Sequence, residues 1–197
     1  MNYLAHLYFS DLTPNSCVGQ LLPDCMPIRR LPADAPQELL DFAHLHQHID
    51  RFTDHHPEVV ALRHSFAPPY RRFAGVLIDV FFDHELANRW TAHHHQPLPE
   101  FAQAVYSALR GYTGPENERL RALRLAMIEH QWLPNYATRT GMNRALNSLD
   151  RRSRFTTPLG QAVDLLETHG AQITDTFSRF FPDLRASIQA RKPFSNA

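Results

Sequence analysis

The chain has 197 residues, with 20 basic and 20 acidic side chains, so its formal net charge is zero when histidine is neutral. This balance gives no electrostatic signature of nucleic-acid binding, and no apolar run approaches the roughly 20 residues that span a bilayer. The start, MNYLAHLYFSD, lacks the basic region and the small-residue cleavage site of a signal peptide. The two cysteines, Cys17 and Cys25, lack the spacing of a redox or zinc pair. We therefore expect one cytoplasmic domain over residues 1–197, with no nucleic-acid or membrane partner.

Helical patterns follow one another along the chain, with prolines between them, and no stretch shows the sustained alternation of a strand. Thr13 and Pro14 mark the start of a short helix that Pro23 closes. Longer helices are expected at 36–54, from 57 to the prolines at 68–69, and at 74–91, 100–111, 114–132, 157–170 and 171–192. The sequence thus predicts an all-α, single-domain helical bundle.

The segment AGVLIDVFFDHELANRW, residues 74–90, places two carboxylates in an apolar helix. Asp79 and Asp83 are four residues apart, about one helical turn, so they point the same way. Such a pair is repulsive and poorly solvated, and without a cation at least one member is expected to be protonated near neutral pH. We expect a divalent metal ion between them, and a metal-free protein at least as stable after either is replaced by alanine. Exposure of the pair, or pairing with a neighbouring arginine, is the alternative.

A second helix repeats this pattern. In ELLDFAHLHQHIDRFTDHHP, His46, Asp50 and Asp54 are spaced four apart and form one polar stripe. Bundled helices that project acidic residues and histidines inward are a standard way to build a metal site. Carboxylates with one or two imidazoles suit Mn²⁺, Mg²⁺ or Fe²⁺ better than structural zinc. An ordinary surface pair of His46 with Asp50, and Asp54 as a helix-end residue, are the alternatives.

Five segments, taken in order, carry a resemblance to a known family: MNYLAHLYFS (1–10), GQLLPD (19–24), LHQHIDRFTDHHPEV (45–59), RRFAGVLIDVFFDHELANRW (71–90) and EHQWLPNY (129–136). With these segments the chain resembles the acyl carrier protein phosphodiesterases, also called acyl carrier protein hydrolases. They are related to the HD-domain metal-dependent phosphohydrolases, so the resemblance implies an HD-domain-like fold. It covers most of the N-terminal two thirds of the chain.

The resemblance implies a metal-dependent phosphodiester hydrolase that removes 4'-phosphopantetheine from holo acyl carrier protein and leaves the apo carrier. It also adds His6 and Asp24 to the candidate ligands of the ion, which we expect to be Mn²⁺, with Mg²⁺ or Fe²⁺ as alternatives. The full set of candidate ligands is His6, Asp24, His46, Asp50, Asp79 and Asp83. The catalytic candidates are Asp24, Asp50, Asp79, Asp83 and His84. His84 either donates a proton to the departing serine oxygen or holds a carboxylate in place.

Acyl carrier proteins are small, helical and acidic, so the resemblance also implies a basic surface around the site. The candidates for carrier binding are Arg29, Arg30, Arg51, Arg71 and Arg72. A second basic cluster consists of Arg151, Arg152 and Arg154. Two other interpretations stay open. One is an HD-type phosphohydrolase acting on a nucleotide or another small phosphoester, and the other is a non-catalytic helical module that docks a carrier protein.

Overall fold

The computed structural model describes residues 1–152 and 157–191, with only the backbone of Arg152. Within these ranges all regular structure is helical and no residue lies in a strand, which confirms the all-α prediction. The elements are, in chain order, α1 (Tyr3–Tyr8), α2 (Pro14–Gly19), η1 (Leu22–Asp24), η2 (Ile28–Arg30), α3 (Gln37–His55), α4 (Pro57–Ser65), η3 (Arg71–Phe73), α5 (Ala74–Asn88), α6 (Trp90–His93), α7 (Leu98–Arg110), α8 (Glu118–Glu129), α9 (Trp132–Asn135), α10 (Arg139–Arg152), η4 (Leu159–Asp164) and α11 (Leu165–Gln189).

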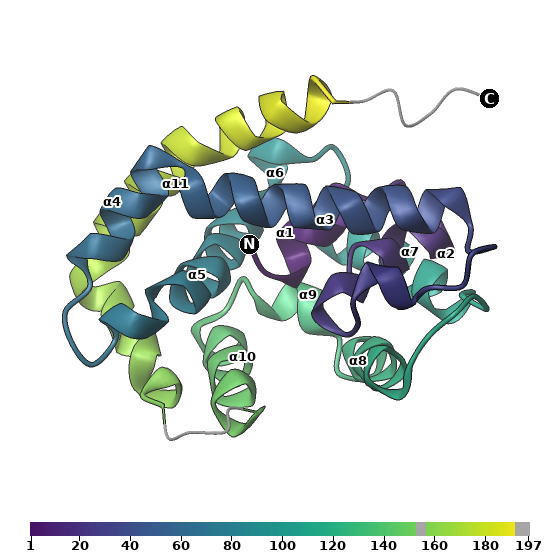
Figure 1. The fold of residues 1–197 in the computed structure, drawn as a ribbon. Helices are drawn as coiled ribbons and strands as arrows, with labels where there is room; N and C mark the ends of the chain where they lie inside the picture. The colour runs from purple at the N-terminus through teal and green to yellow at the C-terminus, as the bar shows by residue number, and fades with distance from the viewer. Residues whose placement is uncertain (153–156, 192–197) are drawn as a thin grey trace.

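The helices form a single domain around one apolar core (Figure 1). The long helix α3 spans the molecule, and α11 runs from the lower left, behind α4, to the upper edge of the view. The N-terminus lies near the middle, beside α1 and α5, whereas α8 and α10 lie at the lower edge. The start of the chain is therefore surrounded by elements from distant parts of the sequence.

Helix α5 is buried on nearly all sides. Its fully buried side chains include Leu77, Val80, Phe81 and Leu86, and it packs against α1, α4, α10 and α11. A helix that is apolar all round belongs in a core, which explains why this segment shows no single hydrophobic stripe. No helix in the described part of the chain is both long and apolar enough to cross a membrane.

The N-terminal helices begin where the sequence signals place them. Thr13 caps α2 in a reciprocal capping box with Ser16, and Pro14 occupies the first turn. The end of α2 differs from expectation, because the helix stops at Gly19 and Pro23 lies inside η1. A Cβ atom at Gly19 would lie 2.6 Å from the Cβ atom of Phe42, so this glycine permits the close approach of α2 to α3.

The C-terminal half departs further from the predicted elements. Gln131, with a φ of 50°, breaks the expected helix at 114–132 into α8 and α9. Helix α10 follows in a region where the sequence indicated no element. The two helices expected at 157–170 and 171–192 form instead the short η4 and one continuous α11, which runs through Gly170 and contains Pro182. The expected end at residue 192 lies outside the described residues.

Candidate metal centre

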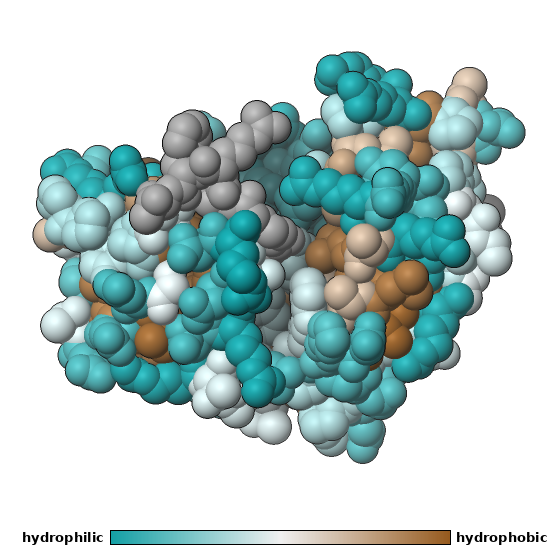
Figure 2. Space-filling view, turned by 90° about the horizontal axis from the view of Figure 1, so that it is seen from below, coloured by the Kyte–Doolittle hydropathy of each residue, from teal (hydrophilic) through white to brown (hydrophobic). Residues whose placement is uncertain are grey.

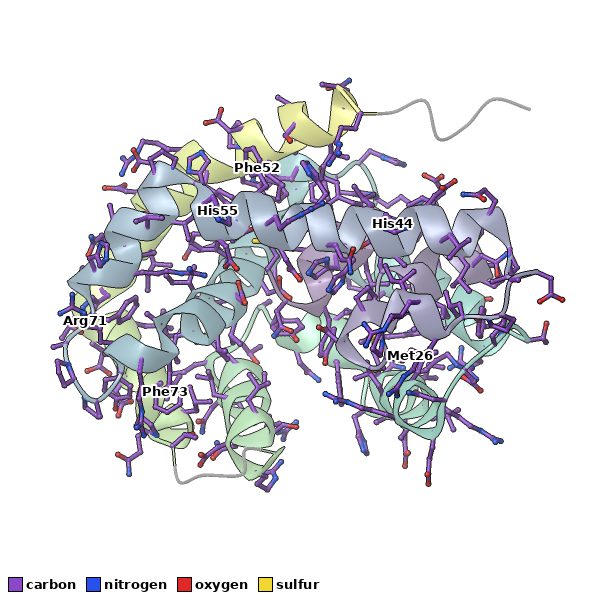
Figure 3. All side chains as sticks on the ribbon, in the orientation of Figure 1. Met26, His44, Phe52, His55, Arg71 and Phe73 are labelled. Carbon is purple, nitrogen blue, oxygen red and sulfur yellow. The ribbon has the colours of Figure 1, made fainter. Side chains whose placement is uncertain are left out.

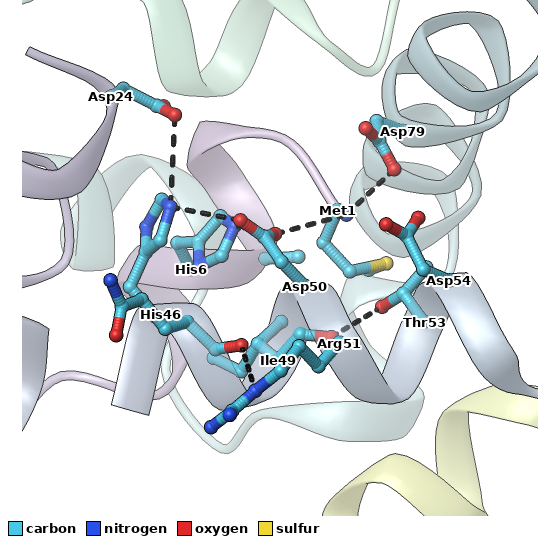
Figure 4. A network of polar contacts seen from close by, with 12 residues as sticks. Met1, His6, Asp24, His46, Ile49, Asp50, Arg51, Thr53, Asp54 and Asp79 are labelled. Carbon is cyan, nitrogen blue, oxygen red and sulfur yellow. Dashed lines mark hydrogen bonds and ion pairs between the residues drawn. The ribbon is translucent and has the colours of Figure 1, made fainter. Parts of the chain in front are cut away.

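Two buried histidines form the floor of the candidate site (Figure 4). His6 lies on α1 and His46 on α3, and their side chains are only 1% and 2% exposed. Their rings stack with centroids 3.9 Å apart and planes inclined by 15°. Two imidazoles in such contact cannot both be cationic without strong repulsion. Burial, followed by the neighbouring His46, lowers the pKa of His6 below its ordinary value.

Asp50 joins the two rings. It lies one turn after His46 on α3, and its two carboxylate oxygens are 3.1 Å from His6 Nε2 and 3.0 Å from His46 Nε2. Burial acts to raise the pKa of Asp50, but the hydrogen bonds from both histidines outweigh it and hold that pKa well below the ordinary range. For His46, burial acts to lower the pKa, and the contact with Asp50 outweighs it, so the pKa is raised. A buried imidazole beside a carboxylate marks a place where a bound cation can replace a proton.

Backbone and side-chain groups around His46 fix its orientation. Its Nδ1 atom lies 2.8 Å from the carbonyl oxygen of Gln20, and because a carbonyl only accepts, Nδ1 carries the hydrogen. This contact directs Nε2 toward Asp50 and toward Asp24 Oδ1, which is 3.7 Å away. Metal-binding histidines are commonly held in this way by a carbonyl or carboxylate on the other ring nitrogen. Sequence reasoning missed Gln20, because a backbone carbonyl leaves no signal in residue type.

The chemistry of these residues fits a divalent cation. Donor atoms of His6, His46 and Asp50 lie within 4.8 Å of one another, the one such group found among the described residues. Asp24, with a side chain 45% exposed, and Asp50, 42% exposed, open the cluster to solvent above the buried rings. His6 Nδ1 is buried and has no hydrogen-bond partner within the described part of the chain. The arrangement offers imidazole and carboxylate donors on one side and room for water or substrate on the other.

A positive charge of the chain itself lies beside Asp79. The Met1 ammonium is 2.7 Å from Asp79 Oδ1 and 3.9 Å from Asp50 Oδ1 (Figure 4). Burial acts to lower the pKa of this ammonium, but Asp79 and Asp50 outweigh it and raise that pKa. The sequence predicts a metal ion at this place. Asp79 therefore lies at the edge of the cluster, with its role as a metal ligand still a prediction.

Asp83 caps the first helix. Its two oxygens accept hydrogen bonds from the backbone N–H groups of Leu4, at 2.7 Å, and Ala5, at 3.1 Å, in the first turn of α1. The side chain is completely buried, and mainly for this reason its pKa is raised to about 7, with Asp79 a minor cause. The sequence predicts that, without a cation, at least one carboxylate of the pair is protonated near neutral pH; the raised pKa of Asp83 lies in that direction, but burial and not repulsion by Asp79 is its main cause. Both oxygens serve the backbone, so Asp83 positions the helix that carries His6.

His84 lies against α9. Its Nδ1 atom donates to the carbonyl oxygen of Tyr136 at 2.7 Å, and Asn88 Nδ2 lies 3.1 Å from Nε2. No contact within the described residues joins His84 to His6, His46 or Asp50. The structure thus leaves the proton-donor role of His84 as a prediction.

The remaining candidates lie on the surface. Asp54, the last residue of the predicted stripe on α3, is exposed and pairs with Arg63 instead of the cluster. Arg51 is also exposed, and its Nε donates to the carbonyl oxygen of Gln47 one turn earlier.

The two arginine pairs predicted to bind a carrier are exposed and lie far from each other. Arg29 and Arg30 form η2, shortly after Asp24, and Arg71 and Arg72 form η3. Figure 3 shows Arg71 at one end of the molecule and Met26, which precedes η2, toward the other. Of the second basic cluster, Arg154 and the side chain of Arg152 lie outside the described residues.

Fold and site together define a class: an all-α protein in which His6, His46 and Asp50 bring together donor atoms that could hold a metal ion. A family model for acyl carrier protein phosphodiesterase matches residues 1–184. The chain belongs to the acyl carrier protein phosphodiesterase family.

Individual relatives agree with this assignment over nearly their whole length. An Enterobacter protein named acyl carrier protein phosphodiesterase is 32% identical over 193 residues, 97% of this chain and 98% of its own. Proteins with the same name from Klebsiella pneumoniae and Yersinia pestis are 31% and 28% identical, and cover 93% and 98% of this chain and 95% and 100% of their own. No solved structure matches the chain.

Proposed function

We infer that the protein is a phosphodiester hydrolase that removes 4'-phosphopantetheine from holo acyl carrier protein, leaving the apo carrier, and that it uses a divalent metal ion. The family and the names of the relatives support the reaction. The observation that supports a metal ion is the pair of buried, stacked imidazoles that share the carboxylate of Asp50. The mixture of imidazole and carboxylate donors suits Mn²⁺, with Mg²⁺ and Fe²⁺ as alternatives.

Within this proposal, His6, His46, Asp50 and Asp24 hold the ion. When bound, a divalent cation lowers the pKa of a coordinated water and neutralises charge on phosphate oxygens. The Gln20 carbonyl keeps His46 in the tautomer that presents Nε2. Asp83 fixes the start of α1 and thereby the position of His6 on that helix. Asp79 as a further ligand, and His84 as the group that protonates the leaving serine oxygen, complete the proposed set, whereas Asp83 acts through the start of α1.

The mass of the carrier tests the reaction directly. Holo carrier protein is incubated with the purified protein and Mn²⁺, Mg²⁺ or Fe²⁺, and loss of the 4'-phosphopantetheine mass is expected. Tight carrier binding without that loss would favour a non-catalytic docking module. Hydrolysis of free nucleotides with no action on the carrier would favour an HD-type phosphohydrolase of small phosphoesters.

Metal is expected to stabilise the native state, because only the folded chain brings His6, His46 and Asp50 together. At 100 times its dissociation constant, a ligand adds about 2.7 kcal/mol to the free energy of unfolding, which raises the melting temperature of a chain of this size by about 5–10 °C. The melting temperature is measured with Mn²⁺ and after chelation, for the wild type and for His46→Gln and Asp79→Ala. A wild type that gains no more than His46→Gln contradicts the site. An Asp79→Ala variant that gains as much as the wild type removes Asp79 from the ligands.

Carrier binding is expected to depend on charge and to weaken as salt is added. Arg29 and Arg30 lie close in sequence to Asp24 at the solvent-facing edge of the cluster, so we expect Arg29→Glu with Arg30→Glu to raise KM for the carrier more than it lowers kcat. Arg71→Glu with Arg72→Glu, on η3, makes the same change in charge and tests the other predicted surface. Steady-state kinetics at two salt concentrations measures both. An unchanged KM in either double variant excludes that pair from the docking surface.

A further inference from the structure

A cavity of about 600 Å³ shares none of its lining residues with the metal centre. Its lining comes from the N-terminal segment, the C-terminal end of α8, helix α9 and one face of α10. Figure 2, which views the molecule from below, shows this face hollowed between α8 and α10. The volume lies in the range of small-molecule sites, and the lining joins aromatic side chains and amides with two arginines, Arg144 and Arg151.

Asn2 contributes an amide that the fold leaves available. It stands at the N-cap position of α1, where asparagine usually accepts a hydrogen bond from the first turn. Here Asp83 takes that role from α5, and the Asn2 side chain makes no capping bond. The half-buried amide lines the cavity instead, with no hydrogen-bond partner among the described residues.

Helix α9 adds a second amide to the lining, and aromatic rings complete it. Asn135 uses its Nδ2 group on the carbonyl oxygens of His130 and Gln131, which fixes the side chain at the cavity. The rings of Tyr3 and Trp132, with centroids 5.9 Å apart, supply apolar surface. Amides and aromatic rings together suit a flexible ligand that carries its own amides between short apolar segments.

The first residues of the chain connect the lining of the cavity to the metal centre. Asn2 and Tyr3 line it, and the preceding Met1 ammonium lies 3.9 Å from Asp50. On the other side, the backbone of Tyr136, a lining residue, accepts a hydrogen bond from His84. The cavity and the cluster therefore border the same N-terminal segment.

We propose that this cavity binds the pantetheine part of the substrate, the arm of two amides and a terminal thiol that extends from the phosphate to be cleaved. The proposal rests on the proposed function for the identity of the phosphodiester. The amides of the arm bond to Asn2 and Asn135, and its apolar segments pack on Tyr3 and Trp132. This arm distinguishes the substrate from small phosphodiesters that present only the reacting phosphate.

The test fills the cavity without touching the cluster. Ala145 on α10 and Ala126 on α8 both line it, so Ala145→Phe and Ala126→Phe occupy its space from two independent sides. Ala122→Phe, one turn before Ala126 and exposed, is the matched control.

Binding is followed by the fluorescence of Trp132 during titration with pantetheine, and Trp132→Phe, which retains the buried Trp90, identifies the source of the signal. The same variants are assayed on holo carrier and on bis(4-nitrophenyl) phosphate, which lacks the arm.

We expect saturable pantetheine binding in the wild type and in Ala122→Phe. Both filled variants should lose at least about 10-fold in affinity and in kcat/KM on the carrier, with unchanged hydrolysis of bis(4-nitrophenyl) phosphate. Filled variants that bind pantetheine and process the carrier like the wild type overturn the proposal, as does a cavity that binds AMP and not pantetheine. Pantetheine binding by a wild type that releases nothing from the carrier supports the cavity and contradicts the hydrolase function.

Discussion

Replacing Asp50 by alanine is expected to abolish release of 4'-phosphopantetheine from the carrier. Asp50 is the carboxylate that both buried histidines contact, so its loss removes the shared donor of the proposed metal centre. Replacing a residue that only hydrogen-bonds to a metal ligand costs about 10–100-fold in metal affinity or activity. Asp50 is itself a proposed ligand, so we expect kcat/KM of its alanine variant to fall by more than about 100-fold. The mass of the carrier and the binding of Mn²⁺ are measured together.

Asp54→Ala provides the control on the same helix. Asp54 is also an aspartate on α3, one turn later, but it is exposed and pairs with Arg63. Its replacement should leave hydrolysis and Mn²⁺ binding unchanged. Equal losses in the two variants would mean that α3 as a whole, and not the carboxylate of Asp50, supports the activity.

Replacing Asp83 by alanine is expected to destabilise the protein by about 2–5 kcal/mol, because two backbone N–H groups in the first turn of α1 lose their acceptors. This reverses the expectation from sequence, in which removal of a repulsive carboxylate costs no stability. The repulsion is a minor influence, since burial is the main cause of the raised pKa of Asp83 and Asp79 contributes little. Denaturant unfolding of the metal-free proteins measures the difference.

Two further variants define the cause of the loss. Asp175→Ala removes an exposed aspartate from the middle of α11 and should change the free energy of unfolding by no more than about 0.5 kcal/mol. Asp83→Asn keeps one oxygen as an acceptor and should fall between the wild type and Asp83→Ala. A stable Asp83→Ala variant would show that α1 does not depend on this cap.

The features that the sequence predicted best are side-chain contacts that depend on spacing within one helix. His46 and Asp50 are one turn apart, and the structure brings their side chains to 3.0 Å as the helical period requires. The apolar context of Asp79 and Asp83 correctly indicated an unusual environment for a carboxylate pair. The resemblance added His6 and Asp24, which no local pattern singles out.

The groups that bond to Asp79 and Asp83 could not be predicted from spacing within one helix. Asp83 is held by the backbone of Leu4 and Ala5, and Asp79 by the Met1 ammonium, all of them about 80 residues away in sequence. Backbone N–H groups are present at almost every residue, so their position is set by tertiary packing and leaves no mark in composition. The same holds for α11, where apolar contacts of Ile173 and Phe177 override the tendency of glycine and proline to end a helix.

The shortness of α1 has a consequence for the motions of the protein. Six residues are too few for a helix to persist alone in water, so α1 remains ordered only while α5 and the core hold it. His6 lies on this helix, and local opening of α1 would carry its ring out of the cluster. Hydrogen exchange of the α1 amides should therefore slow whenever an ion occupies the cluster, because the opened form cannot bind it. In this protein the binding of a cation and the local opening of the short helix α1 are therefore coupled equilibria.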